Sequence, residues 1–288
     1  MSTEPSVIHD IGYQRYHGPR LSRLAVLGAL YVHGLRTAFG LGRTAKAKIF
    51  PWLAVGIVSL VAVILAAVRS QTGVIPLSYV EFADAMSWLV ILFVAIVAPE
   101  LVSRDIRSGV LPLYFSRPLR AADYVAAKVA ALATAVWLLI GGPQLLMFLG
   151  AALTTKKGMT GVWNEVRDVV PALSYSLLWA IVFALISLLV ASLTGKRAFA
   201  AGGIVAVFLM TTPVVGVLSI LPSSAARSLA GLASPMTLVS GVGTWLIPTA
   251  ETGFPVDRYG LVYGIEVVTL VAACLFLLLA RYRKVASA

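Results

Sequence analysis

Residues 49–68 read IFPWLAVGIVSLVAVILAAV, a run that carries no charge and a single serine. A helix needs about 20 mostly apolar residues to cross roughly 30 Å of hydrocarbon, so this run predicts a membrane-spanning helix. The whole chain is 59% hydrophobic and 12% charged, about half the charged fraction of a typical soluble domain. Such a chain has too little polar surface to cover a water-soluble globule. The sequence therefore predicts an integral membrane protein.

Further apolar stretches along the chain predict five more spans. They lie at about 82–102, 129–155, 169–195, 198–226 and 259–280. The uncharged window 228–250 holds three glycines and two prolines, which lower its tendency to form a helix. We expect a short interfacial or re-entrant helical hairpin there rather than a seventh span. The predicted fold is an all-α integral membrane protein with six transmembrane helices.

The distribution of lysine and arginine gives the expected orientation. With six spans and both termini in the cytoplasm, 17 of the 23 lysines and arginines fall on the inner side, as the positive-inside rule requires. A seventh span would place RYRK (281–284) outside, against that rule. Because the basic residues lie at the ends of apolar runs, the net charge of +11 favours membrane topology and argues against a nucleic-acid partner. The abundance of Ala, Val, Gly and Arg is typical of a GC-rich bacterial genome, so the expected location is the bacterial plasma membrane.

Three regions are expected along the chain. They are a cytoplasmic leader (1–50), a six-helix transmembrane domain (51–281) with a polar inner loop (103–124) and an outer segment of short helices (222–258), and a cytoplasmic tail (282–288). Within the leader, one helical face carries Leu24, Leu27, Tyr31, Leu35 and Ala38. His33 and Arg36 fall on another face, which predicts an amphipathic helix in the inner headgroup layer. A plain membrane anchor and a contact with a partner subunit are both open for this helix.

Small residues repeat at four-residue intervals at the start of the third predicted span. They are Ala127, Ala131 and Ala135. Such a strip allows another helix to approach closely, and it predicts packing within the molecule rather than a ligand site.

The loop between the second and third spans is densely polar. Its first part, SRDIRSGVL (103–111), has Ser103 as an expected N-cap and Gly109 as an expected helix stop. Its second part, SRPLRAADYVAAK (116–128), has Pro118 where a helix can begin. Two short helices joined at a bend have a shape suited to docking another protein. A solvated loop with positive-inside anchors is the alternative.

The order of residues in this loop resembles that of type 2 ABC-transporter permeases. An acid, a glycine and a leucine are followed by Ser-Arg-Pro-Leu, a tyrosine, and a lysine that enters the next helix. The matching residues are Asp105, Gly109, Leu111, Ser116, Arg117, Pro118, Leu119, Tyr124 and Lys128. This sequence departs from the pattern at Arg104-Asp105, where many relatives carry Arg-Glu or Glu-Arg.

The resemblance implies how the loop works. In that family it forms a coupling helix that sits in a cleft on a separate ATPase subunit. These residues, together with Arg104, would then couple the chain to two ATPase copies. A second permease copy, identical or related, would complete the transporter among the membrane lipids. The layout of the whole chain, with a basic leader, six spans and a helical outer segment, resembles the family as well.

No nucleotide, metal or catalytic motif is visible in the chain. The phosphate-binding loop G-x-x-x-x-G-K-[ST] is absent, so ATP and Mg are expected on the partner subunit and no cofactor on this chain. His9, His17 and His33 are too scattered for a metal site. No set of residues suits a nucleophilic or acid–base enzyme. The expectation is a transport subunit that is not itself an enzyme.

Acidic residues within reach of the membrane are the candidates for a translocation path. Glu266 lies about two turns into the last span, and Glu100 lies at the end of the second. Such residues are costly in hydrocarbon and are often functional. The leading hypothesis is export of an amphipathic, drug-like or lipid-like compound. One rival is a proton-coupled carrier that uses Glu266. Such a carrier predicts an internal repeat, and the two halves of the sequence show no repeat. The other rival is a membrane scaffold without transport.

Overall fold

The computed structural model describes residues 18, 22–109, 119–247 and 256–286, and all the regular structure in these ranges is helical. The helices are α1 (Arg23–Ala38), α2 (Ala45–Thr72), α3 (Tyr79–Ala85), α4 (Ser87–Leu101), α5 (Ser103–Arg107), α7 (Ala121–Thr154), α8 (Gly158–Ser192), α9 (Arg197–Ser219), α10 (Ser224–Leu229), η1 (Ala230–Ala233), α11 (Pro235–Leu246), η2 (Asp257–Tyr259) and α12 (Gly260–Ala286).

Five of the described helices, α2, α7, α8, α9 and α12, are long and apolar enough to cross a membrane. Two further pairs pass the same test together but are bent, α3 with α4–α5 by 52° and α10–η1 with α11 by 119°. The described ranges therefore contain five to seven candidate spans. The window 82–102, expected to be one helix, is broken at Met86. The break turns α3 toward α8, where its polar side chains find partners.

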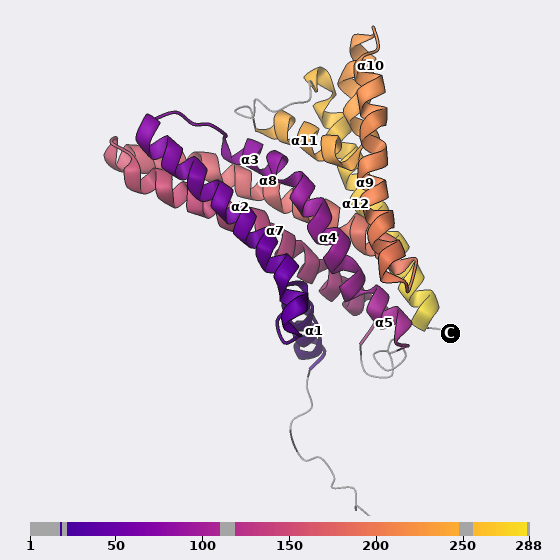
Figure 1. Cartoon of the computed structure of the whole chain (residues 1–288). Coiled ribbons are helices and arrows are strands. Elements are labelled where there is room, and N and C mark those ends of the chain that lie inside the picture. Colours follow the sequence, from indigo (N-terminus) through magenta and orange to yellow (C-terminus); the bar gives the residue numbers. More distant parts are fainter. Residues whose placement is uncertain (1–17, 19–21, 110–118, 248–255, 287–288) are drawn as a thin grey trace, which may run out of the picture.

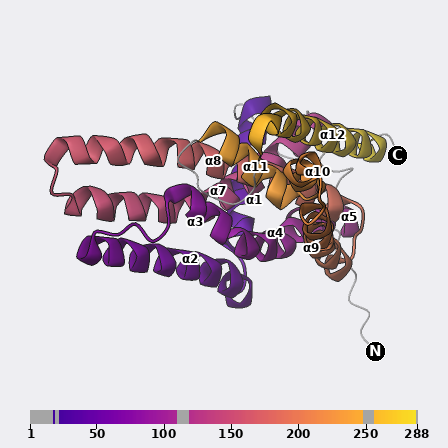
Figure 2. The ribbon, with the colours of Figure 1, turned by 90° about the horizontal axis from the view of Figure 1, so that it is seen from above.

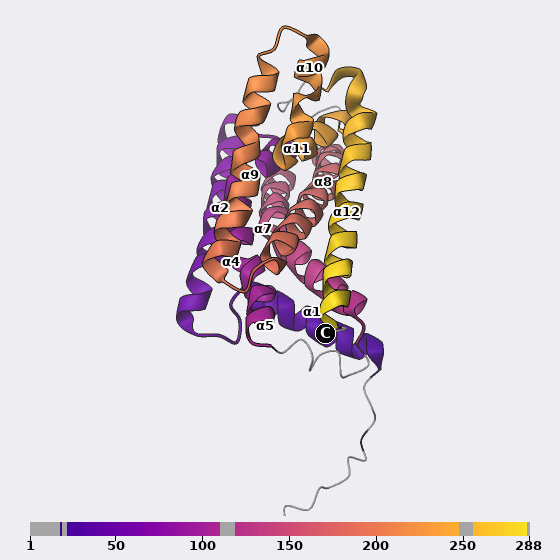
Figure 3. The ribbon, with the colours of Figure 1, turned by 90° about the vertical axis from the view of Figure 1, so that its right-hand side faces the viewer.

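The helices form two arms that meet at one end of the molecule. Figure 1 shows α2, α7 and the first half of α8 leaning away from the more upright α9 and α12. The arms converge where α1, α5 and the C-terminal end of α12 lie, and Figure 3 shows the same three elements at one end. We call this the polar-loop end, because the loop 103–124 begins there.

Helices α7 and α8 form the centre of the fold. In each of them 61% of the most apolar stretch is buried, against 22% in α2, 17% in α9 and 22% in α12. Seen from above, α7 and α8 run side by side between α2 and α12 (Figure 2). The peripheral helices α2, α9 and α12 expose large apolar side chains over most of their length, as helices facing lipid do.

Small residues allow the closest helix contacts. A Cβ added to Gly34 on α1 would lie 2.8 Å from the Cβ of Ala131 on α7. One added to Gly150 on α7 would lie at the same distance, 2.8 Å, from the Cβ of Ala66 on α2. The alanine strip of α7 is buried, so the prediction that it packs within the molecule is confirmed.

Helix α1 packs against α7 and α4. Ser22 starts it, since its Oγ accepts a hydrogen bond from the backbone N of Ala25 at 3.3 Å. Most of the predicted apolar face contacts the core, and the hydroxyl of Tyr31 donates to Oγ1 of Thr134 at 3.2 Å. Leu24 is the exception, because its side chain is 77% exposed.

The described part of residues 222–258 contains the short helices α10, η1 and α11, followed by η2. Its glycines have a packing role that composition does not reveal. A Cβ on Gly243 would lie 2.6 Å from the ring of Tyr175, and one on Gly241 would overlap the ring of Tyr263. Two of the three glycines in the window 228–250 thus let α11 lie directly on aromatic rings of α8 and α12.

Candidate functional site

Helix α5 is a five-residue helix that follows the end of α4 and begins the polar loop. Ser103 was expected to be its N-cap, and that prediction is wrong. Val102 precedes the helix without a side-chain cap, and the Ser103 Oγ instead donates to the carbonyl oxygen of Ala191 on α8 at 2.8 Å. Gly109 follows the helix at φ +64°, so the expected helix stop is confirmed there.

Three residues of the predicted coupling motif meet in one buried cluster. Lys128 Nζ lies 2.8 Å from Oδ2 of Asp105, and the Tyr124 hydroxyl donates to the same oxygen at 2.8 Å. Lys128 is only 4% exposed, and its Nζ also donates to the carbonyl oxygen of Leu101 at 2.7 Å. A buried ammonium costs several kcal/mol unless it is paired. Asp105 and the end of α4 therefore hold α5 against α7.

The C-terminal part of α12 joins the same cluster. The rings of Tyr124 and Tyr282 lie with their centroids 4.9 Å apart at an interplanar angle of 48°. Tyr282 is fully buried near the end of α12. The C-terminal part of α12 thus meets α5 at the start of α7, although it is distant from both in sequence.

Glu100 is buried at the same end, in an ion cluster of its own. It pairs with Arg43, whose Nη1 lies 2.7 Å from its Oε2, and with Arg197 at the start of α9. The exposed fraction of Glu100 is 8%. The ion pairs of this buried carboxylate connect the α1–α2 turn and the start of α9 to the end of α4.

The start of α1 is attached to the start of α7 by a bidentate ion pair. Arg23 donates from Nε to Oδ2 of Asp123 at 2.8 Å and from Nη2 to Oδ1 at 2.6 Å. This hydrogen bonding raises the pKa of the Arg23 guanidinium. Asp123 also accepts from the backbone N of Arg120 at 3.0 Å, which caps α7.

Two adjoining clefts open at this end. The larger, about 900 Å³, is lined by cationic and polar side chains of α1, the α1–α2 turn, α5 and α7; we call it the basic cleft. Its charged lining residues are Arg36, Arg43, Glu100, Arg104, Asp105 and Lys128. The smaller, about 350 Å³, lies between α2 and α4 and we call it the α2–α4 cleft. Both share the side chains of Arg43 and Glu100.

The remaining predicted residues are placed as follows. Arg104 is exposed on α5 and lines the basic cleft. Glu266 is exposed on α12, where it has no hydrogen bond or ion pair within the described part of the chain. Leu111, Ser116, Arg117 and Pro118 lie outside the described residues.

A second buried polar network, not predicted from the sequence, lies at the opposite end. Arg69 on α2 forms a bidentate pair with Glu165 on α8, and the Tyr79 hydroxyl donates to Oε2 of Glu165 at 2.8 Å. Gln144 on α7 donates from Nε2 to the Tyr79 carbonyl oxygen at 2.8 Å, and the Ser176 Oγ donates to Oε1 of Gln144 at 2.8 Å. Five residues of four helices thus form hydrogen bonds with one another.

Asp84 has hydrogen-bond partners at the same end of the molecule. It accepts a hydrogen bond from the Tyr175 hydroxyl and one from Ser240 Oγ at 3.4 Å. These bonds connect α3 to α8 and α11. The carboxylate is therefore held inside the protein at the bend between α3 and α4.

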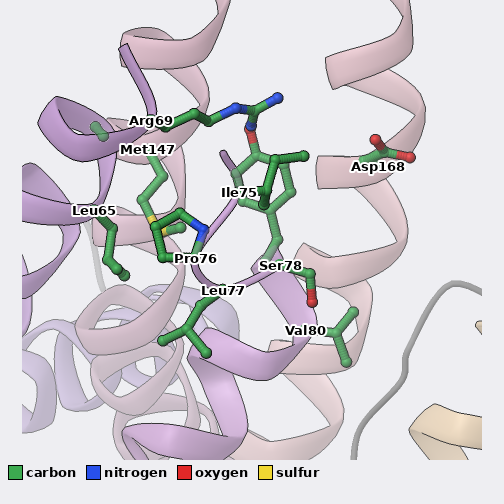
Figure 4. Close-up of a pocket in the computed structure, with 11 residues that line it drawn as sticks. Leu65, Arg69, Ile75, Pro76, Leu77, Ser78, Val80, Met147 and Asp168 are labelled. Atoms are coloured by element: carbon green, nitrogen blue, oxygen red, sulfur yellow. The ribbon is translucent and has the colours of Figure 1, made fainter. Parts of the chain in front are cut away.

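A cavity of about 210 Å³ lies beside this network, between α2, α3, α7 and α8. Figure 4 shows apolar side chains around it, among them Leu65, Pro76, Leu77 and Met147, with Arg69 and Asp168 extending from two helices. Because Arg69 is already paired with Glu165, the cavity is mainly apolar.

No set of three or more His, Cys, Asp or Glu side chains among the described residues could hold a metal ion. The fold defines an all-helical chain whose apolar helices fit a multi-pass membrane protein. No protein-family model matches the chain, and no curated protein matches it. The functional conclusion therefore depends on the polar-loop end and on the chemistry of its residues.

Proposed function

We propose that this chain is the membrane-spanning permease subunit of a type 2 ABC transporter, which exports an amphipathic compound. Its six spans would be α2, α3–α4, α7, α8, α9 and α12, with both termini in the cytoplasm. Helix α1 would be the amphipathic connecting helix, and α10–α11 a re-entrant pair on the outer side. A separate ATPase subunit would dock on the loop 103–124 and supply ATP and Mg.

The observation that carries this proposal is the convergence of Asp105, Tyr124 and Lys128. These residues belong to the loop motif, and they form one buried hydrogen-bonded cluster between α5 and α7. A force applied to α5 reaches α7 through that cluster and reaches α8 through Ser103. Ion pairs of low exposure transmit displacement because separating them costs several kcal/mol. Helix α5 is thus joined to the two most buried helices.

The distribution of charge supports the same orientation. Lysines and arginines concentrate around α1, α5, the start of α9 and the end of α12. A membrane protein that follows the positive-inside rule has this end in the cytoplasm. ATP binding on two partner ATPases would then close them against the loops of two permease copies and shift access from the inside to the outside.

Affinity purification of the full chain from its native membrane tests the proposal. We expect an ATPase subunit with a phosphate-binding loop to co-purify, and we expect Gly109→Pro and Arg117→Glu to abolish the association. Helix content and elution volume of each variant serve as folding controls. Transport by the purified chain alone under a pH gradient, lost in Glu266→Gln, would instead identify a proton-coupled carrier. A stable chain with neither an ATPase nor transport would leave the scaffold role.

A further inference from the structure

The basic cleft has more positive than negative charge after its internal pairs are formed. Asp105 is matched by Lys128, and Glu100 by Arg43, with Arg197 as a second cation on the same carboxylate. Arg36 and Arg104 line the cleft as exposed side chains without an ion pair in the described part of the chain. Their charges remain available to an anion.

The neighbouring α2–α4 cleft continues from the cationic region into an apolar one. Lys46 and Arg197 line its polar side, and Phe50, Pro51 and Ile96 line its apolar side. The two clefts share Arg43 and Glu100, so they form one continuous depression. A ligand in it would meet cations at one end and hydrocarbon at the other.

Exposed apolar strips lead away from this depression on both neighbouring helices. On α4 the strip follows Ile96 at four-residue intervals through Leu92 and Trp88, all exposed. On α2 it follows Phe50 through Leu53, Ile57, Leu60 and Ile64, and these four side chains are exposed. Residues at these spacings lie on one face of a helix. The two strips run from the polar-loop end toward the opposite end of the molecule.

We propose that this depression binds an anionic membrane phospholipid. The phosphate diester of its headgroup would lie between Arg36 of the basic cleft and Lys46 of the α2–α4 cleft, with its acyl chains along the strips of α2 and α4. Arginine and lysine bind phosphate well, and basic side chains near a membrane surface strengthen binding of anionic lipid. A free phosphate ion would use the cations and leave the apolar strips without a partner. The lipid fits both halves of the site.

This site is independent of the proposed transport function, because the test needs only the purified chain. The headgroup would sit beside Glu100, Arg43 and Arg197, the cluster that connects the α1–α2 turn to α4 and α9. Lipid occupancy would therefore add a bridge across the same elements.

Native mass spectrometry of the delipidated full-length chain tests the proposal with phosphatidylglycerol, phosphatidylcholine and inorganic phosphate as probes. We expect phosphatidylglycerol to be retained at least about tenfold more strongly than phosphatidylcholine, since each nearby cation favours an anionic headgroup. The double variant Arg36→Gln/Lys46→Gln should lower phosphatidylglycerol retention by about tenfold or more. Inorganic phosphate at millimolar concentration should not displace the lipid.

Two comparisons make the test specific. Lys48→Gln/Arg283→Gln removes two exposed cations that line neither cleft, and it should retain phosphatidylglycerol like the unmodified chain. Arg36→Lys/Lys46→Arg keeps both charges and should do the same, which separates loss of charge from loss of fold. Equal retention of the two lipids, equal loss in the two Gln variants, or displacement by inorganic phosphate would each overturn the proposal.

Discussion

The ammonium of Lys128 lies 2.8 Å from the carboxylate of Asp105, on the floor of the basic cleft. The two residues are 23 positions apart, and the pair joins α5 to the start of α7. Lys128 is only 4% exposed, so water solvates its charge poorly. Helix α5 is therefore held against the first turns of α7.

Removing one partner of this pair should be more harmful than removing both. Asp105→Asn leaves Lys128 buried without a countercharge, and we expect it to lower the free energy of unfolding by about 3–5 kcal/mol. The double variant Asp105→Asn/Lys128→Met should recover most of that loss. Chemical unfolding in mixed micelles measures both. Arg23→Gln removes an ion pair whose cation is half-exposed and leaves Asp123 with the backbone N–H of Arg120. It should therefore lower stability less than Asp105→Asn. Similar losses in the single and double variants would contradict a buried pair.

Glycine at position 109 should matter for coupling beyond its effect on stability. Gly109 and Gly73 both have positive φ, +64° and +73°, and a Cβ added at either would meet no atom within 4 Å. Alanine at either position should therefore lower the free energy of unfolding by roughly 1 kcal/mol, because only the backbone is strained. We expect Gly109→Ala to reduce transport-coupled ATP hydrolysis of the assembled transporter. Gly73→Ala, at the opposite end, should leave that activity near its normal value while lowering stability equally. If the two variants reduced ATP hydrolysis equally, Gly109 would have no role in coupling beyond its contribution to stability.

The Tyr79 hydroxyl should contribute more to stability than an ordinary tyrosine hydroxyl. It donates to the ionised Glu165 in a buried network, so Tyr79→Phe should cost about 1.5–3 kcal/mol. Tyr31→Phe removes a bond to the neutral hydroxyl of Thr134 and should cost about 0.5–1.5 kcal/mol. The free energies of unfolding of the two variants, measured under the same condition, test this order. A larger loss of stability in Tyr31→Phe than in Tyr79→Phe would contradict the buried network.

Two glycines of α1 should respond to alanine with opposite signs. A Cβ at Gly34 would crowd Ala131, whereas one at Gly28 meets no atom within 4 Å. Gly34→Ala should lower stability by about 1–3 kcal/mol through overpacking. Gly28→Ala should raise it by up to about 1 kcal/mol through helix propensity. Thermal unfolding measures both, and a gain at Gly34 would show that α1 does not pack on α7.

The apolar windows predicted most of the long helices, because length and hydropathy decide whether a segment can span a bilayer. They predicted the helix ends less well. Helix α8 begins at Gly158, well before the predicted span 169–195, because a helix continues through polar residues whose side chains have partners. Glu165 is such a residue, held by Arg69 and Tyr79.

The candidate site was predictable only where its residues lie close in sequence. The order Asp105, Gly109, Tyr124 and Lys128 is a local pattern, and the short helix with its glycine stop follows from it. The partners of Glu100 come from two other parts of the chain, and nothing in the spacing of charges joins them. Such pairs depend on tertiary packing, as does the bend at Met86.

Site-specific labelling at Arg117 decides whether the polar loop is the docking element for an ATPase. Cys274 is the one native cysteine, so a Cys274→Ser background carries Arg117→Cys as the single reactive thiol. In intact cells we predict that a membrane-impermeant maleimide added outside leaves this thiol unmodified. In inside-out vesicles a bifunctional thiol reagent should cross-link it to an ATPase subunit. Modification of position 117 from outside the cell would contradict both the orientation and the function proposed for this chain.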